Sequence, residues 1–458
     1  MISQGTKQQI DFGSDSLGKL LTKMSVPAIV AMVVNGLYYL VDTAFVGWGV
    51  GSSALAGLAV VFPIQMFMIA WGSMLGMGAA AVIARKLGES RKEEAGSAAF
   101  HAVLLAALSG IAFLAVTLLA GKPLLYGFGA SEGTFTDARD YLQALQYGFI
   151  FVFLSMAGFN IMRAEGDAAR AGIGMLLGTV VNVALDPLFI FTFDMGVGGA
   201  AWATVIARGV STAYFFILLL GKRRSIFANF SRRFRLNTAG AIISLGLGNF
   251  LGQVSISIVA VIMNTSLRCY GTSIDLAVYG VLSRMLVFIT MPLLGLAQGL
   301  QPIAAYNYGS GALGRVREVS LRALGVSTIM GILMYLLPLA APELTMHLFT
   351  DDPLVIAAGV RPLQVALCAL PFLGIQILGF TLFQALGQPF STLIVSLSRQ
   401  LIFLVPLLVL LPMIRGVDGL WIAYPAADVL SVLLTLMMVR PVFSRSRSRA
   451  DAVAGEIY

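Results

Sequence analysis

Residues 54–84 read ALAGLAVVFPIQMFMIAWGSMLGMGAAAVIA, a run of 31 residues without a charged side chain. A helix needs about 20 mostly apolar residues to cross about 30 Å of hydrocarbon, so this stretch can span a membrane. Eleven similar stretches cover residues 25–47, 96–120, 139–162, 169–193, 198–221, 238–266, 275–305, 318–341, 355–383, 389–411 and 418–440. The sequence therefore predicts an all-α integral membrane protein with twelve transmembrane helices.

The composition of the 458-residue chain agrees with this class. Hydrophobic residues make up 58% and charged residues 11%, against roughly 25% charged in soluble domains. This excludes a disordered chain, a disulfide scaffold and a nucleic-acid-binding domain. Two cysteines and two histidines give no metal-ligand motif. The sequence also lacks a GxxxxGK[ST] loop and a Ser/His/Asp grouping, so we expect no enzyme activity and no cofactor.

The basic residues are distributed unevenly along the chain. Of its 30 Lys and Arg residues, 22 lie in segments on one side of the predicted membrane, and Arg163 is counted among them. Only four lie in segments on the other side. Cytoplasmic loops carry this excess, so we expect both termini in the cytoplasm. The net charge of +8 is thus a topology signal.

The sequence contains an internal repeat. At an offset of 221 residues, Gly78 aligns with Gly299 and Gly88 with Gly309, and the offset becomes 220 after residue 196. Each half holds six spans, so both enter from the same side, as in a parallel repeat. The predicted organisation is an N-lobe (1–221), a basic cytoplasmic linker (222–237), a C-lobe (238–446) and a tail (447–458). Two such bundles would enclose a central cleft, as in an alternating-access transporter.

Polar residues in the N-terminal half fall at one depth. Asp42, Asp186 and Thr204 each lie five to seven residues from the expected outer end of a span, roughly 8–11 Å below the surface. Tyr141 starts slightly above this layer. Helical spacing adds Asn182 below Asp186, and Asn35 and Tyr38 below Asp42.

Ionisable groups inside a membrane are costly and are functional candidates by default. Two carboxylates in one poorly solvated pocket repel each other, so either one takes a proton or a cation sits between them. This favours a role in ion or proton coupling. The alternative is a hydrogen-bonded cluster that only fixes helix packing. Pro27, below Asp42, predicts a bendable helix coupled to ion release; alternatively it lies near a helix start, where proline is tolerated.

The C-terminal half has a different set of buried polar residues. Arg284, Arg399 and Asp428 fall near mid-depth, and we expect Arg399 and Asp428 to pair. Gln298 and Gln301 form a polar inner end to the eighth span, with a gate or packing role. Arg208 aligns with Asp428 across the repeat and receives no role from the sequence.

Several motifs resemble the multidrug and toxic compound extrusion (MATE) family, most like its DinF-like and MepA-like prokaryotic branch. They are Pro27 with Asn35–Gly47, Arg163–Asp167, Asn182–Pro187 and Gly295–Gly309. The resemblance implies a V-shaped pair of six-helix lobes and export of cationic amphiphilic drugs or dyes by H⁺ or Na⁺ antiport across a prokaryotic plasma (inner) membrane.

The resemblance also implies site residues. The family's N-lobe cation site corresponds here to Asp42, Asn182, Asp186 and Thr204, with Tyr38 and Tyr141 around them. An acidic residue in the seventh helix, typical of the NorM-like branch, is absent from this sequence. We expect a monomer in contact with the bilayer and with no nucleic acid. A flippase for lipid-linked saccharides is the alternative function, and a channel is a weaker one.

Overall fold

The structure is a computed structural model that describes residues 11–49, 52–221, 226 and 234–455. For residues 38–44, 47–49, 52–55 and 444–455 it describes the backbone alone. Every regular element in these ranges is helical. The predicted all-α membrane fold is confirmed.

The first group of helices, here called the N-lobe, comes from the N-terminal half. Its elements are α1 (Leu17–Gly49), α2 (Ser52–Gly88), α3 (Lys92–Gly127), α4 (Glu132–Leu145), the 3₁₀ turn η1 (Gln146–Gly148), α5 (Phe149–Ala164), α6 (Ala168–Pro187), the π-helical segment η2 (Leu188–Thr192) and α7 (Gly196–Gly221).

The second group, the C-lobe, repeats this order. Its elements are α8 (Leu236–Tyr270), α9 (Ser273–Gly309), α10 (Leu313–Ala340), α11 (Pro342–His347), α12 (Pro353–Leu367), α13 (Leu370–Ala385), α14 (Pro389–Leu397), the π-helical segment η4 (Ser398–Leu404), α15 (Val405–Arg415) and α16 (Val417–Gly455). Most of the expected linker, residues 222–225 and 227–233, lies outside the described residues.

Twelve spans are found when one broken helix is counted as a single crossing. Eleven helical stretches among the described residues are long and apolar enough to cross a membrane, and α12 with α13 forms a further pair bent by 48°. The expected span 355–383 is therefore interrupted. Its partner across the repeat, α4 with α5, is interrupted at the matching place by η1.

Two helices are longer than the sequence predicts. α1 begins at Leu17 instead of residue 25, so part of the expected polar leader is helical. α16 continues through Pro425 and Pro441 into the expected tail, as far as Gly455.

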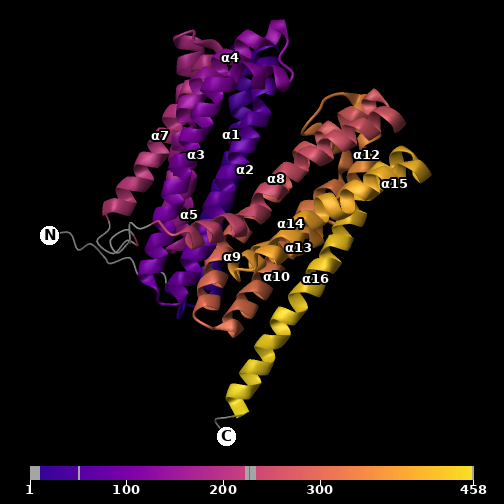
Figure 1. Cartoon of the computed structure of the whole chain (residues 1–458). Coiled ribbons are helices and arrows are strands. Elements are labelled where there is room, and N and C mark those ends of the chain that lie inside the picture. Colours follow the sequence, from indigo (N-terminus) through magenta and orange to yellow (C-terminus); the bar gives the residue numbers. More distant parts are fainter. Residues whose placement is uncertain (1–10, 50–51, 222–225, 227–233, 456–458) are drawn as a thin grey trace, which may run out of the picture.

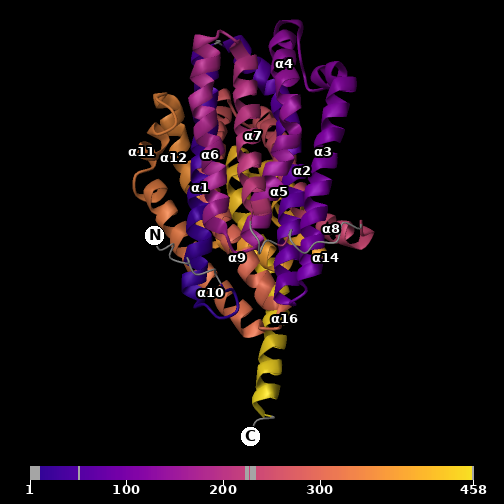
Figure 2. The same ribbon diagram turned by 90° about the vertical axis from the view of Figure 1, so that its left-hand side faces the viewer.

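The two lobes converge at one end of the molecule and diverge toward the other, which gives a V (Figure 1). Turned by 90°, the N-lobe helices stand nearly parallel in front of the C-lobe (Figure 2). Contacts between the lobes run from α1 to α9 and from α2 to α8 and α9. We refer to the two ends as the converging end and the open end.

Glycines let the lobe backbones touch at the converging end. A Cβ atom added to Gly78 would lie 2.1 Å from the carbonyl oxygen of Ile242, and one added to Gly88 would lie 2.0 Å from that of Tyr306. The repeat partners make matching contacts: a Cβ on Gly299 would lie 2.1 Å from Ser25 Oγ, and one on Gly309 would lie 2.2 Å from the Arg85 oxygen. These contacts follow the 221-residue offset, so the lobes meet with pseudo-two-fold symmetry.

His101 ties the start of α8 to the N-lobe. The buried imidazole Nε2 accepts a 2.8 Å hydrogen bond from the backbone N–H of Arg235, the residue just before α8. Nδ1 must then carry the proton, and it donates to the Ser97 carbonyl at 2.6 Å. The neutral ring thereby fixes where the chain enters the C-lobe.

Candidate functional site

Three of the predicted N-lobe site residues meet between α6 and α7. Asn182 Nδ2 lies 3.4 Å from Asp186 Oδ1 and 3.4 Å from Thr204 Oγ1. Asp186 is fully buried, and Asn182 is 2% exposed. The spacing of i, i+4 on α6 brings the amide beneath the carboxylate, and α7 supplies the hydroxyl. The predicted convergence of these three side chains is thus seen in the structure.

The local helix geometry at Asp186 is irregular. Pro187 follows it and has no N–H, so the carbonyl of Val183 lacks its helical donor. The chain then passes into the π-helical η2. Among the described residues, the buried Asn182 Oδ1 also accepts no hydrogen bond. Carbonyl, carboxylate and hydroxyl oxygens are the ligands that hard cations prefer, so the arrangement offers oxygen acceptors in a buried place.

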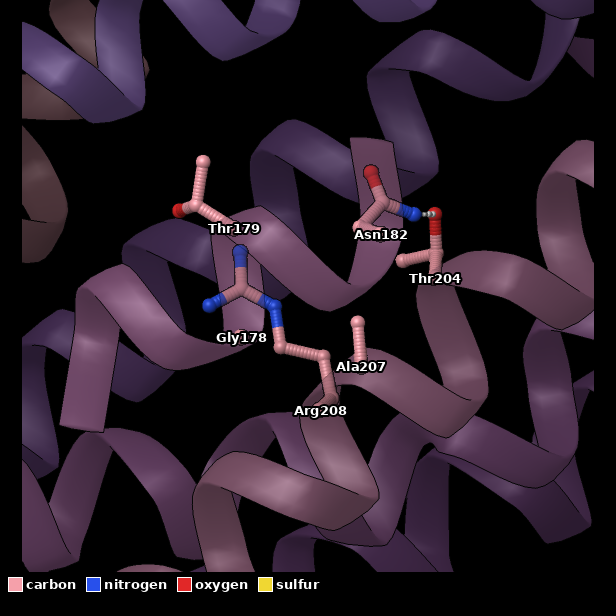
Figure 3. A pocket seen from close by; sticks show the side chains of 6 residues that line it. All are labelled: Gly178, Thr179, Asn182, Thr204, Ala207 and Arg208. Atoms are coloured by element: carbon pink, nitrogen blue, oxygen red, sulfur yellow. Dashed lines mark hydrogen bonds between the residues drawn. The ribbon is translucent and has the colours of Figure 1, made fainter. Parts of the chain in front are cut away.

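A small cavity adjoins these residues on the side of the converging end. It has a volume of about 10 Å³ and is lined by Gly178, Thr179, Asn182, Thr204, Ala207 and Arg208. The guanidinium of Arg208 projects along α6 beside Gly178 and Thr179 (Figure 3). A cavity of this size admits about one water molecule.

The other predicted N-lobe residues are placed less completely. Tyr141 is buried on α4, and its phenol oxygen accepts a 3.0 Å hydrogen bond from Gln65 Nε2. Asn35 is half-buried on α1. Tyr38 and Asp42 belong to the backbone of α1, but their side chains lie outside the described residues. Their approach to Asp186 remains a prediction.

Pro27 lies in the interior of α1, ten residues after its start. It packs against α6, since a Cβ added to Gly172 would lie 3.2 Å from the Pro27 carbonyl oxygen. The reading of Pro27 as a proline near a helix start is therefore wrong, because α1 begins eight residues earlier than predicted. An interior proline removes one helical hydrogen bond and favours a bend.

In the C-lobe, Arg399 and Asp428 form the expected ion pair. Arg399 Nε donates to Asp428 Oδ1, and both side chains are largely buried, at 14% and 5% exposure. Arg399 comes from η4 and Asp428 from α16. The pairing prediction is confirmed.

The remaining C-lobe residues do not join this pair in one cluster. Arg284 is exposed on α9. Gln301 is fully buried at the converging end, where its Nε2 donates to Gln384 Oε1 at 2.6 Å and to the Met77 carbonyl at 3.2 Å. Gln298 Nε2 contacts Met32 Sδ at 3.5 Å. Gln298 and Gln301 lie about four to five helical turns along α9 from Arg284. Their side chains contact N-lobe residues, so the buried polar residues expected in the C-terminal half do not form one cluster.

The sequence prediction missed the role of Arg163. It was counted with the inner loops, but it is buried in α5, at 1% exposure. Its guanidinium donates to Asn160 Oδ1 and across the lobes to the Gln298 carbonyl, and it lies 5.4 Å from the Phe159 ring centroid. The repeat offers a signal, since Arg163 aligns with Gln384 at the 221-residue offset. Gln384 is also buried, and it bonds to Gln301, which contacts the Met77 carbonyl of the N-lobe.

Comparison with known proteins matches this architecture. A family model described as MatE matches residues 27–188 and 247–410, one match in each lobe. The multidrug export protein MepA of Staphylococcus haemolyticus is 24% identical over 96% of this chain and 97% of its own, and MepA of Staphylococcus aureus N315 is 25% identical over 93% and 94%.

A solved structure gives the same result at the level of the fold. It is described as the outward-facing conformation of a multidrug resistance MATE family transporter of the MOP superfamily, and it superposes with a TM-score of 0.90 at 26% identity, covering 97% of this chain and all of that one. Members of this family are membrane transporters and not enzymes. With two lobes, about twelve spans and a family match in each half, this chain belongs to the MATE family of multidrug export transporters.

Proposed function

We propose that this transporter exports cationic amphiphilic compounds in exchange for H⁺ or Na⁺ by alternating access between its lobes. Asp42, Asn182, Asp186 and Thr204 hold the coupling ion, and Tyr38, Tyr141 and Asn35 support them. The observation that carries the proposal is the fully buried Asp186 carboxylate, bonded through Asn182 to Thr204 on the next helix. A buried carboxylate that gains and loses a cation changes the charge between α6 and α7, and such a change can bias helix packing.

The orientation is part of the same proposal. Arg85, Lys86 and Arg91 form ion pairs with Glu89 and Glu94 at the converging end, where the excess of basic residues falls. By the positive-inside rule, this end faces the cytoplasm of a prokaryotic cell. The V then opens away from the cytoplasm, and both termini lie inside. The working unit is one chain.

Transport into proteoliposomes tests the proposal. The full chain is reconstituted, and ethidium movement is followed under a pH gradient and, separately, under a Na⁺ gradient. We expect one gradient to drive wild-type transport, and Asp42→Asn and Asp186→Asn to lower it at least about tenfold. That factor corresponds to about 1.4 kcal/mol, near the lower end of what a hydrogen bond to a charged group contributes.

Asp351→Asn is the matched control, because Asp351 is exposed in the loop before α12. It makes the same chemical change away from the site and should transport as wild type does. Wild-type transport that survives both site substitutions would remove these carboxylates from coupling. A wild type that moves no cation but flips lipid-linked saccharide would replace the proposed substrate class with that alternative.

A further inference from the structure

The charged residues of α6 and α7 differ from their repeat partners in the C-lobe. Asp428 is the partner of Arg208 at the offset of 220, and Arg399 is the partner of Gly178 at the offset of 221. In the C-lobe, these two positions carry opposite charges that form the Arg399–Asp428 ion pair. In the N-lobe, the arginine stands on α7, the position that matches Arg399 is a glycine, and both residues line one cavity.

Arg208 is therefore a cation without the counter-ion that its place in the repeat would supply. No ion pair or hydrogen bond links its side chain to another described residue, and Arg208 is half-buried in the middle of a membrane helix. A charge in this position is costly unless it serves a function. Its cost would be lowest if it compensated a nearby negative charge.

The cavity indicates that this negative charge is the Asp186 carboxylate. Arg208 follows Thr204 by one helical turn on α7, and Gly178 precedes Asn182 by one turn on α6. Arg208 and Asn182 line the same cavity (Figure 3), and Asn182 bonds to Asp186. A Cβ atom added to Gly178 would lie 2.1 Å from Ser211 Oγ, so α6 and α7 pack closely here, and the guanidinium lies beside this contact (Figure 3).

The other charged groups on the helices packed around α6 show whether another cation could compensate Asp186. α6 contacts α1, α5 and α7. Away from their converging ends, these four helices carry three charged residues: Asp42, Asp186 and Arg208. The other charged residues of these four helices are Lys19, Lys23, Arg163 and Arg170, all within about two turns of the converging ends. Among the cationic residues of these four helices, Arg208 is thus the one that lies within about one helical turn of Thr204, a residue predicted to hold the coupling ion.

We propose that Arg208 is a built-in cation that makes the N-lobe site selective for protons over Na⁺. A fixed guanidinium disfavours any added positive charge in a medium of low dielectric constant, whether H⁺ or Na⁺. The selectivity comes from space: the guanidinium lines a cavity of about 10 Å³, whereas Na⁺ needs several oxygen ligands around it. A proton needs no ligand shell, because it binds covalently to one carboxylate oxygen.

The orientation of Asn182 agrees with this selectivity. Its amide nitrogen, a donor, faces both Asp186 Oδ1 and Thr204 Oγ1. The Asn182 Oδ1 described above is turned away from these two oxygens, so a Na⁺ ion between Asp186 and Thr204 would require the amide to rotate. The proposal rests on the proposed function, since it names the coupling ion of that antiport site.

Sodium binding by the purified full-length protein tests the proposal without a transport assay. Melting temperatures are measured in NaCl and in choline chloride at equal ionic strength and alkaline pH, where protons compete least. We expect wild type to melt alike in both salts. Arg208→Gln should be stabilised by NaCl, with an apparent Na⁺ affinity about tenfold or more above that of wild type.

Two further variants separate charge from structure. Arg208→Lys keeps the cation and should stay indifferent to Na⁺. Arg361→Gln removes an exposed arginine that pairs with Asp418 at 3.4 Å on the C-lobe surface, and it should also behave as wild type does. In proteoliposomes, a pH gradient alone should drive wild-type transport, and a Na⁺ gradient should drive transport by Arg208→Gln.

A wild-type protein that NaCl stabilises would overturn the proposal, even if Arg208→Gln failed to fold. A folded Arg208→Gln that remains indifferent to Na⁺ would overturn it as well. If neither gradient drives wild-type transport, the proposed antiport is wrong, while the melting experiment still decides whether Arg208 excludes Na⁺.

Discussion

At the scale of single residues, helical spacing and depth in the span were good guides to which side chains meet. Spacing placed Asn182 with Asp186 on α6, and depth predicted the pair of Arg399 with Asp428 on neighbouring helices. In both cases the sequence shows the side-chain groups of both partners. The contact of Gln301 with the Met77 carbonyl could not be predicted in this way. Every residue has a backbone carbonyl, so such an acceptor leaves no mark in the sequence.

The buried Arg399–Asp428 pair allows a prediction about stability. Arg399→Met removes the cation and leaves the Asp428 carboxylate uncompensated, at 5% exposure. Breaking a buried pair from one side costs about 3–5 kcal/mol, whereas replacing both partners by apolar residues is often close to neutral. We therefore expect Arg399→Met to melt well below wild type and Arg399→Met/Asp428→Leu to recover most of the loss.

Thermal unfolding in detergent, followed by tryptophan fluorescence, provides the measurement. Transport by the folded double variant then reports whether the pair has a role beyond packing. A double variant that is as unstable as the single one would show that the two charges do not compensate each other.

At the scale of helices, the sequence located every span but not every end. The apolar runs defined where lipid contact is possible, whereas α1 and α16 extend past those runs. The added first turns of α1 mix lysines with leucines that are buried in the core, such as Leu20 and Leu21. The break between α12 and α13 was also missed, because Cys368 and Ala369 carry no helix-breaking signal of their own. Pro371 follows at the second position of α13, where proline is tolerated.

The interior Pro27 leads to a prediction for α1. Pro27→Ala restores a backbone donor and removes a residue that costs about 3 kcal/mol in a helix interior. If bending of α1 is part of the cycle, the variant should be more stable than wild type but several-fold slower in transport. Stability is measured by melting, and transport by the proteoliposome assay.

Pro338→Ala provides the comparison, since Pro338 is buried in the interior of α10 in the C-lobe. It should gain stability without losing transport. Normal transport by Pro27→Ala would separate the bend of α1 from coupling.

At the scale of the whole molecule, the repeat was readable from identities in the sequence, but the way the lobes meet was not. Glycines at matching positions signalled the register, and only the structure assigns them to backbone contacts between lobes. Likewise, the basic residues near span ends indicated a topology, although one of them, Arg163, is buried between the lobes. A count of charges does not separate a residue that faces water from one that donates to a backbone carbonyl.

The close contact at Gly78 predicts how the balance of conformations can be shifted. Gly78→Ala places a methyl group 2.1 Å from the Ile242 carbonyl oxygen, so the lobes must separate at the converging end. We expect the distance between the lobes at the open end to shorten. Gly325→Ala, in α10 with no atom within 4 Å of the added Cβ, should leave that distance unchanged.

Electron paramagnetic resonance between two spin labels measures this distance. One label is attached to the exposed native Cys269 at the end of α8, with Cys368→Ser removing the second native thiol. The other is attached at Gly133→Cys, at the start of α4, where an added Cβ meets no atom within 4 Å. An unchanged distance distribution in folded Gly78→Ala would show that this contact does not control the spacing of the lobes.

The paired glycine contacts also bear on how such a chain arises. Because Gly88 and Gly309 meet equivalent carbonyl oxygens of opposite lobes, those of Tyr306 and Arg85, the surface that joins the halves is isologous: each half presents the patch that the other needs. A gene for one half alone would already encode both sides of this interface, which is consistent with a homodimer that preceded the fused chain. Fusion then freed the halves to diverge, and one now carries a charge pair where the other carries an arginine and a glycine.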